Sequence, residues 1–162
     1  EEGVDEEEDE EEEVTEEEEP KEEMMTTQSD NQTTELLKKG SPFCLKALQL
    51  FPKHPGALHV LGVWNAEVMR LNSFSRALAK TFLGGQVLGT ASWPEAIRYL
   101  EASVVVEPDR LVHHLDLARV YRDAGRLTDA RASYQAALRA PLKDANDARY
   151  RKSADEELAK LR

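Results

Sequence analysis

The stretch that decides the fold is residues 111–141, LVHHLDLARVYRDAGRLTDARASYQAALRAP. Small and apolar residues recur in it at every third or fourth position, which is the spacing of helices with one buried face. Gly125 interrupts the pattern, as expected at the end of a first helix. In the second helix, Ala130 and Tyr134 lie on the face that would pack against Ala118 of the first. The stretch therefore predicts a helical hairpin with a short turn.

The pattern of the second helix recurs twice upstream. It consists of a small residue, a large or packing residue four positions on, a small residue three positions further, and then a proline. The matching positions are Ala96, Leu100, Ser103 and Pro108 in one copy, and Gly40, Cys44, Ala47 and Pro52 in the other. A first-helix pattern follows the second of these copies, at Leu58, Leu61, Gly62 and Trp64. A multi-point spacing that occurs three times resembles the tetratricopeptide repeat family, which implies an all-α stack of antiparallel helical hairpins.

The patterns predict helices over six segments of the chain. They are residues 34–51, 55–71, 93–106, 110–124, 128–140 and a capping helix within 144–162. Ser92 and Glu95 form a capping box that opens the third of these. In the last helix Ala148, Ala154, Leu158 and Leu161 are spaced for one apolar face. Together these helices define a repeat domain over residues 34–162.

An insertion at about residues 71–92 departs from an ordinary repeat, which would turn within a few residues. Phe74, Leu78 and Phe82 predict a short extra helix in it, closed by Gly84 and Gly85. With its flanking helices, this insertion resembles the regulator of microtubule dynamics family over residues 45–162. The positions that carry the resemblance are His59, Leu61, Gly62, Trp64, Val68, Leu71, Ala79, Phe82, Ala96, Tyr99 and Pro108. Asn65 departs from the family pattern. The resemblance implies association with microtubules or the spindle.

The charge of the chain is divided between two regions of opposite sign. Residues 1–30 carry 18 acidic residues and one basic residue, whereas the other 132 residues carry 20 basic and 14 acidic residues. A glutamate-rich segment without aromatic residues cannot bury enough apolar surface to offset its ordering entropy. We therefore expect a disordered acidic tail at residues 1–33, which either only improves solubility or folds back over basic residues of the repeats and competes with ligands.

Cysteine content and apolar runs bear on the cellular setting. Cys44 is the single cysteine, so no intramolecular disulfide is possible, and a cytoplasmic setting is favoured. Its place in the repeat pattern predicts a packed, unreactive thiol. Trp64 and Trp93 are likewise expected in the core. No apolar run approaches the roughly 18 residues of a membrane span.

The first helix of each hairpin lines the concave groove of such a stack, and this groove is the candidate partner site. Arg119 and Arg122 are neighbours on one helix face, and paired guanidinium groups suit the bidentate capture of carboxylates. The alternative is that both arginines are solvated or pair with Asp116 and Asp123. The predicted groove residues are His59, Val63, Val112, Leu115, Arg119 and Arg122. Their expected ligand is an acidic peptide or an acidic tubulin tail.

The sequence offers no motif for chemistry. His113 and His114 are adjacent, so on a helix they point about 100 degrees apart, and no H-x-x-x-H or C-x-x-C spacing occurs. The glycines at 84, 85 and 89 lack the lysine of a phosphate-binding loop. We therefore expect no catalytic residue, metal or cofactor, and no nucleic-acid binding.

The functional hypothesis is a non-enzymatic scaffold or adaptor that binds protein partners and is associated with microtubules. The alternative is a generic peptide-binding scaffold or a co-chaperone-like adaptor with no cytoskeletal role. A chaperone-type carboxylate clamp is disfavoured, because it needs Lys and Asn at positions where this chain has Val63 and Ala66. The oligomeric state is left open.

Overall fold

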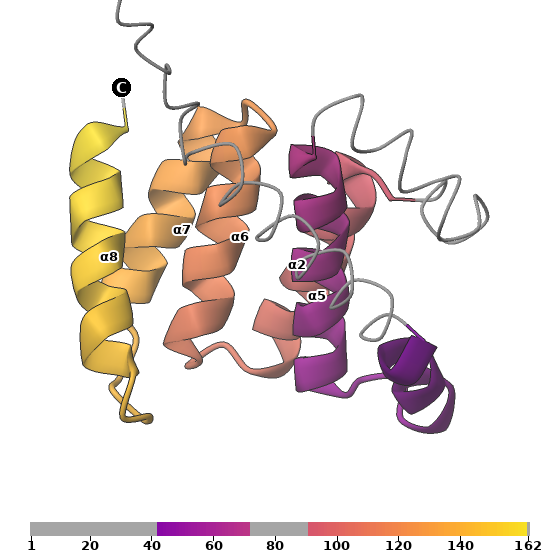
Figure 1. Ribbon diagram of the computed structural model, residues 1–162. Coiled ribbons are helices and arrows are strands. Elements are labelled where there is room, and N and C mark those ends of the chain that lie inside the picture. The colour runs from indigo at the N-terminus through magenta and orange to yellow at the C-terminus, as the bar shows by residue number, and fades with distance from the viewer. Residues whose placement is uncertain (1–41, 72–90, 162) are drawn as a thin grey trace, which may run out of the picture.

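The computed structural model describes residues 42–71 and 91–161, and within these residues every regular element is a helix (Figure 1). A helix covers residues 42–50. It is followed by α2 (Pro55–Arg70), α5 (Trp93–Val106), α6 (Leu111–Asp123), α7 (Leu127–Arg139) and α8 (Asp147–Lys160). The bounds of α2, α5, α6, α7 and α8 confirm the predicted helices to within about three residues. Of the first predicted helix, residues 34–51, the part before residue 42 lies outside the described residues. The predicted acidic tail and the extra helix at Phe74–Phe82 lie outside the described residues.

The α6–α7 hairpin closes through a turn that needs glycine. Gly125 has a φ of 79°, a backbone conformation that residues with a Cβ rarely adopt. The amide of Arg126 donates to the carbonyl of Tyr121 at 2.8 Å, and the amide of Gly125 donates to that of Arg122 at 3.0 Å. These two bonds form a Schellman motif, which satisfies the last carbonyls of α6. The glycine therefore ends α6 and starts the return of the chain, as the sequence predicts.

Helices α2 and α5 pack side by side at a point where α2 has no side chain. An ideal Cβ on Gly62 would lie 2.4 Å from Cγ of Leu100 and 3.1 Å from the carbonyl oxygen of Ala96. The close approach brings the small residues of both helices into the core. At the start of α5, the Ser92 hydroxyl accepts a hydrogen bond from the amide of Glu95 at 3.3 Å, which confirms the Ser92 half of the predicted capping box. The Glu95 carboxylate accepts hydrogen bonds from Arg98.

The main core of the described residues is formed by α2, α5, α6, α7 and α8, and Trp64 and Val68 form a second, smaller cluster. The residues that fit the repeat spacing in α5, α6 and α7 are buried: Ala96, Leu100, Ser103, Ala118, Ala130, Tyr134 and Ala137. In the upstream copy, Ala47 is only half-buried and Pro52 is exposed. Trp64 is also buried, beside Val68, and Trp93 packs against the core from its edge. Cys44 is half-buried, and burial raises the pKa of its thiol. Asn65, the departure from the family pattern, is buried with its amide donating to the carbonyl of Leu61 at 2.8 Å.

Helix α8 covers the end of the stack. Ala154 and Leu161 are buried and Leu158 is half-buried, as the spacing predicts, whereas Ala148 is exposed. Ala148 was predicted to lie on the buried face, but it falls in the first turn of α8, next to the exposed loop of residues 141–146. The apolar face of α8 therefore begins later than the sequence pattern indicates.

Asp147 holds the turn between α7 and α8. Its Oδ2 accepts hydrogen bonds from the amides of Lys143 at 2.7 Å and Asp144 at 2.8 Å, and the residue is buried. Burial alone would raise the pKa of this carboxyl group, but the two amide hydrogen bonds outweigh burial and the pKa is lowered. The carboxylate therefore stays charged and pairs two backbone donors that would otherwise lack partners.

Replacing Asp147 by alanine should lower the free energy of unfolding by about 1–3 kcal/mol, because two amides in a partly buried turn lose their acceptor. Urea denaturation followed by circular dichroism measures the change. Asp155→Ala, at an exposed position of the same helix, is the control and should change the stability by less than about 0.5 kcal/mol. Equal stabilities of the two variants would mean that Asp147 does not hold this turn.

Candidate functional site

The predicted arginines lie in a network of ion pairs that runs along α2, α6 and α8. On α2, Arg70 pairs with Asp123 of α6 at 2.6 Å, and His59 lies 3.2 Å from Asp116 of α6. On the other side of α6, Arg119 pairs with Glu157 of α8 at 2.6 Å. We call this surface the charged face; its members are His59, Glu67, Arg70, Asp116, Arg119, Arg122, Asp123 and Glu157.

Glu157 is the centre of the network. Its carboxylate accepts hydrogen bonds from Arg119, with Nε at 3.0 Å and 3.1 Å from the two oxygens and Nη2 at 2.6 Å from Oε1. Nη1 of Arg122 donates to Oε2 at 3.1 Å, and the hydroxyl of Tyr134 donates to the same oxygen at 2.8 Å. Three side chains from α6 and α7 therefore converge on one carboxylate of α8.

These contacts shift the pKa of each partner so that the guanidinium and the carboxylate stay charged and the phenol stays neutral. The pKa of the Arg119 guanidinium is raised, mainly by its hydrogen bonds with Glu157. Burial would raise the pKa of Glu157, but the hydrogen bonds from Arg119 and Tyr134 and the nearby guanidinium groups lower it. The pKa of Tyr134 is raised by burial and by its bond to Glu157. The carboxylate is therefore ionised and the phenol is a hydrogen-bond donor throughout the neutral pH range.

Asp116 links Arg119 to α2. One oxygen lies 3.1 Å from Nη1 of Arg119, and the other lies 3.2 Å from Nε2 of His59. Burial opposes ionisation of this carboxyl group, but His59 and Arg119 outweigh it and lower its pKa. The alternative weighed from the sequence, that the arginines pair with Asp116 and Asp123, is thus confirmed: Arg122 also contacts Asp123 at 2.9 Å.

His59 of the charged face stacks on a second histidine, His113, which lies behind that face. The rings of His59 and His113 have centroids 4.7 Å apart and planes inclined by 28°. His113 is 4% exposed. Burial, followed by the neighbouring His59 and Arg110, lowers the pKa of His113 to about 4. The His113 ring is therefore neutral at physiological pH and belongs to the packing between α2 and α6.

The other predicted groove residues divide into two groups. Val63 and Val112 are half-buried next to the charged face. Leu115 was predicted to face a partner, but it is fully buried. The reason is helical spacing: Leu115 continues the core stripe of Leu111 and Ala118, while the exposed stripe through Val112 passes through Asp116 instead.

Two residues of the site escape prediction from sequence. Glu157 lies 38 residues from Arg119, in a helix predicted only as a polar cap. Tyr134 was predicted in the core, and its ring is indeed buried, but its hydroxyl reaches the charged face. A polar atom at the tip of a core aromatic is a signal that it needs a partner, although the sequence does not say which one.

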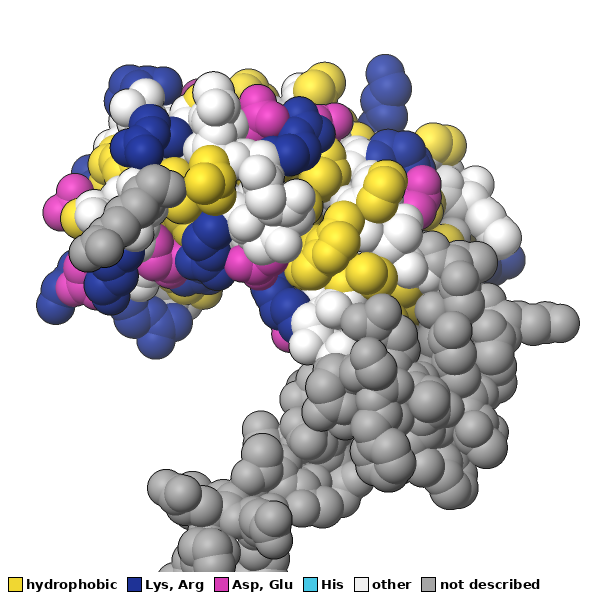
Figure 2. Space-filling view, turned by 90° about the horizontal axis from the view of Figure 1, so that it is seen from above, with side chains coloured by type: hydrophobic (Ala, Val, Ile, Leu, Met, Phe, Trp, Pro, Cys, Tyr) yellow, Lys and Arg dark blue, Asp and Glu magenta, His cyan; other side chains and the backbone are white. Residues whose placement is uncertain are grey.

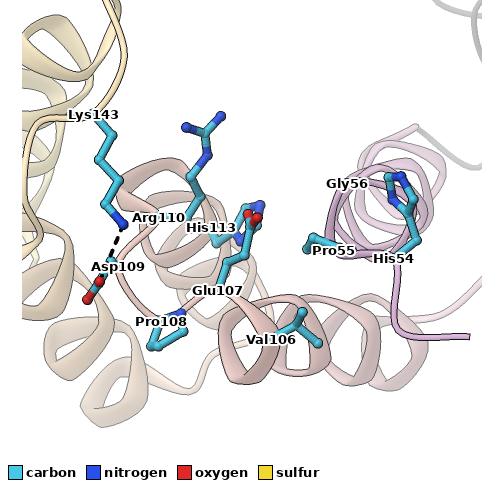
Figure 3. A pocket seen from close by; sticks show the side chains of 10 residues that line it. All are labelled: His54, Pro55, Gly56, Val106, Glu107, Pro108, Asp109, Arg110, His113 and Lys143. Carbon is cyan, nitrogen blue, oxygen red and sulfur yellow. Dashed lines mark hydrogen bonds and ion pairs between the residues drawn. The ribbon is translucent and has the colours of Figure 1, made fainter. Parts of the chain in front are cut away.

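A cavity of about 650 Å³ lies outside the charged face, between the start of α2 and the loop that joins α5 to α6 (Figure 3). Its basic residues already have acidic partners. Lys143 lies 3.3 Å from Asp109, and Arg110 lies 2.6 Å from Asp144. The lysine and the arginine of the cavity therefore offer no uncompensated positive charge to a ligand.

Two other kinds of site are absent from residues 42–71 and 91–161. Within these ranges no group of three metal-ligating side chains is close enough to hold an ion. In the same ranges no helix combines the length and the apolarity needed to cross a bilayer. The expectations of no catalysis and no cofactor stay predictions.

Comparison with known proteins supplies the family. A model of the family "Regulator of microtubule dynamics protein 1-3" matches residues 23–162, which is most of the chain. The match begins earlier than the sequence resemblance indicated, at residue 23 rather than near residue 45, and so reaches into the end of the predicted acidic tail. No curated protein matches the chain. The chain belongs to the regulator of microtubule dynamics family.

Proposed function

We propose that this protein is a non-enzymatic interaction scaffold that associates with microtubules in the cytoplasm or at the spindle, through acidic segments such as tubulin tails that contact the charged face. The match to regulators of microtubule dynamics over residues 23–162 is the observation that carries the proposal. The arrangement of the helices supports it, because hairpin stacks of this kind present extended surfaces to protein partners.

The charged face supplies the chemistry for an acidic partner, but in a compensated form. Arg70, Arg119 and Arg122 give three positive charges, and the four carboxylates of the face give four negative charges. Figure 2 likewise shows Lys and Arg interspersed with Asp and Glu over the surface in view, without a large area of one sign. Recognition of an acidic segment therefore depends on individual arginines and their hydrogen bonds, and not on a broad basic field.

Co-sedimentation with polymerised tubulin tests the proposal. The full chain should pellet with microtubules at low salt and less at physiological salt, because exposed charge contacts are screened. The double variant Arg119→Gln/Arg122→Gln should lose at least about five-fold in affinity, or roughly 1 kcal/mol. The control is Arg139→Gln/Arg149→Gln, which removes two exposed arginines outside the charged face and should bind as the wild type does.

The same assay measures the role of the tail. A shortened chain that begins at Asn31 should pellet more strongly than the full chain if the tail competes for the charged face. If the tail only improves solubility, deleting it should leave the affinity unchanged. Failure of all these proteins to pellet at low salt would instead favour a peptide-binding scaffold with no cytoskeletal role.

A further inference from the structure

The α6–α7 hairpin carries a receptor for a carboxylate that is complete without α8. Arg119 and Arg122 come from α6 and Tyr134 comes from α7, and together they direct five hydrogen bonds of 2.6–3.1 Å to the carboxylate of Glu157. Tyr134 is fully buried as a residue, so the position of its hydroxyl is set by the core. A planar guanidinium with two donors on one carboxylate is the geometry in which arginine recognises acidic ligands.

Helix α8, which supplies the present occupant, is held by contacts that do not involve Glu157. Ala154 and Leu161 are buried in the core, and Asp147 caps the turn before the helix. The guanidinium of Arg131 donates to the carbonyl of Leu161 at 3.0 Å. The Glu157 side chain can therefore leave the receptor by rotation about its own bonds, while α8 stays docked.

The receptor lies at the surface. The side chains of Glu157, Arg119 and Arg122 are 21%, 31% and 39% exposed. A carboxylate from another molecule can thus approach the guanidinium groups from solvent. The exchange of one carboxylate for another keeps the number of charged hydrogen bonds, and the side chain of Glu157 then regains its solvation and its rotamer freedom.

We propose that Glu157 is an internal occupant of a carboxylate-binding site formed by Arg119, Arg122 and Tyr134, and that the external ligand of this site is a glutamate-rich peptide segment of a partner. This inference rests on the proposed function, since it names what the charged face binds and what restrains it. A tethered carboxylate competes at high effective concentration. The peptide can bind only during the fraction of time that Glu157 leaves the site free, and its apparent affinity is reduced in proportion to that fraction.

Two glutamates that are adjacent in sequence provide a matched test. Glu157→Gln removes the occupant's charge, whereas Glu156→Gln makes the same change at an exposed residue that lies 3.8 Å from Lys152, outside the receptor. Fluorescence anisotropy with a labelled eight-residue polyglutamate peptide measures binding to the full chain, and polyglutamine of equal length is the control peptide.

We expect Glu157→Gln to bind polyglutamate about ten times more tightly than the wild type, and Glu156→Gln to differ from it by less than two-fold. Adding Arg119→Gln to Glu157→Gln should remove the gain. Equal gains from both glutamate variants would overturn the proposal, because net charge would then explain them. No gain from Glu157→Gln would also overturn it.

A second variant covers the case in which Glu157→Gln does not fold. Glu157→Asp keeps the charge but shortens the side chain by one methylene group, so it should fill the receptor less well and also tighten peptide binding. Glu156→Asp is its control. Equal binding by these two variants would count against an internal occupant.

Microtubule pelleting of the same proteins separates this inference from the proposed function. If Glu157→Gln gains polyglutamate affinity but neither it nor the wild type pellets, the carboxylate site stands and the microtubule proposal fails. If the wild type pellets and neither Glu157→Gln nor Arg119→Gln changes pelleting or polyglutamate affinity, microtubule association stands without the charged face and the site inference is overturned.

Discussion

Replacing Gly62 by alanine should lower the free energy of unfolding by about 2–3 kcal/mol, because the core between α2 and α5 has no room for a methyl group. The added Cβ would lie 2.4 Å from Cγ of Leu100 and close to the backbone oxygen of Ala96. The Leu100 side chain is fully buried and cannot move aside. The gain of about 1 kcal/mol that alanine offers over glycine within a helix offsets only part of this cost.

Thermal and urea denaturation of the full chain measure the effect. Gly56→Ala is the matched control, because it lies in the exposed first turn of the same helix and its added Cβ would contact only the His54 ring, at 3.3 Å or more. In a double-mutant cycle, Leu100→Ala should suppress part of the cost of Gly62→Ala, since it removes the atom that is struck. Strictly additive effects would show that the two positions do not compete for space.

Acidification from pH 7 to pH 5 should cost the wild type about 2 kcal/mol of stability through His113 alone. Its pKa is lowered to about 4 in the folded protein, against about 6.5 in an unfolded chain. The unfolded state therefore takes up the proton first, and the contribution of His113 is complete above pH 6.5 and is lost as the pH falls toward 4. Asp147, whose pKa is lowered in the folded protein, loses its contribution only below the usual range of a carboxyl group.

Burial is the main cause of the lowered pKa of His113, and the charged groups around it act in the same direction. The stacked His59 comes from α2, and Arg110 and His114 come from its own segment; all three oppose a positive charge on His113. The carboxylate of Glu107 belongs to the cavity that His113 also lines (Figure 3), but burial dominates.

Urea denaturation at a series of pH values compares the wild type with His113→Gln, which keeps a hydrogen-bond donor but does not titrate. The variant should be less stable at pH 7 and should lose much less stability between pH 7 and pH 5. His114→Gln is the control and should follow the wild-type slope. Parallel slopes for His113→Gln and the wild type would exclude His113 as the source of the pH dependence.

The helices could be predicted from the sequence because their signals are local. The Ser92 cap, the turn at Gly125 and the small residues at Ala96 and Ala130 each act within one helix or one turn, so spacing alone locates them. The family resemblance had the same basis, since Gly62 and Trp64 lie within a single turn of α2.

The site could be predicted only in part because its contacts join separate repeats. The sequence placed Arg119 and Arg122 on one face, but the Glu157 carboxylate reaches them from a helix more than 30 residues away. Which faces of neighbouring hairpins meet depends on how the repeats pack, and this is not encoded in any one repeat. Leu115 was predicted wrongly for a different reason. Consecutive residues of a helix point about 100 degrees apart, so Leu115 lies on the buried side of α6 while its neighbour Asp116 lies on the charged face.

The ion pairs of the charged face join α2 to α6 and α6 to α8, while the two helices of the α6–α7 hairpin are joined mainly by their apolar packing. The pairs between helices therefore link neighbouring repeats, whereas the pairs of Arg70 with Glu67 and of Arg119 with Asp116 lie within one helix. Salt weakens partly exposed ion pairs of this kind without weakening the apolar core. The curvature of the scaffold should consequently respond to ionic strength under conditions in which each hairpin stays intact, so that the shape presented to a partner is adjustable while the fold is not.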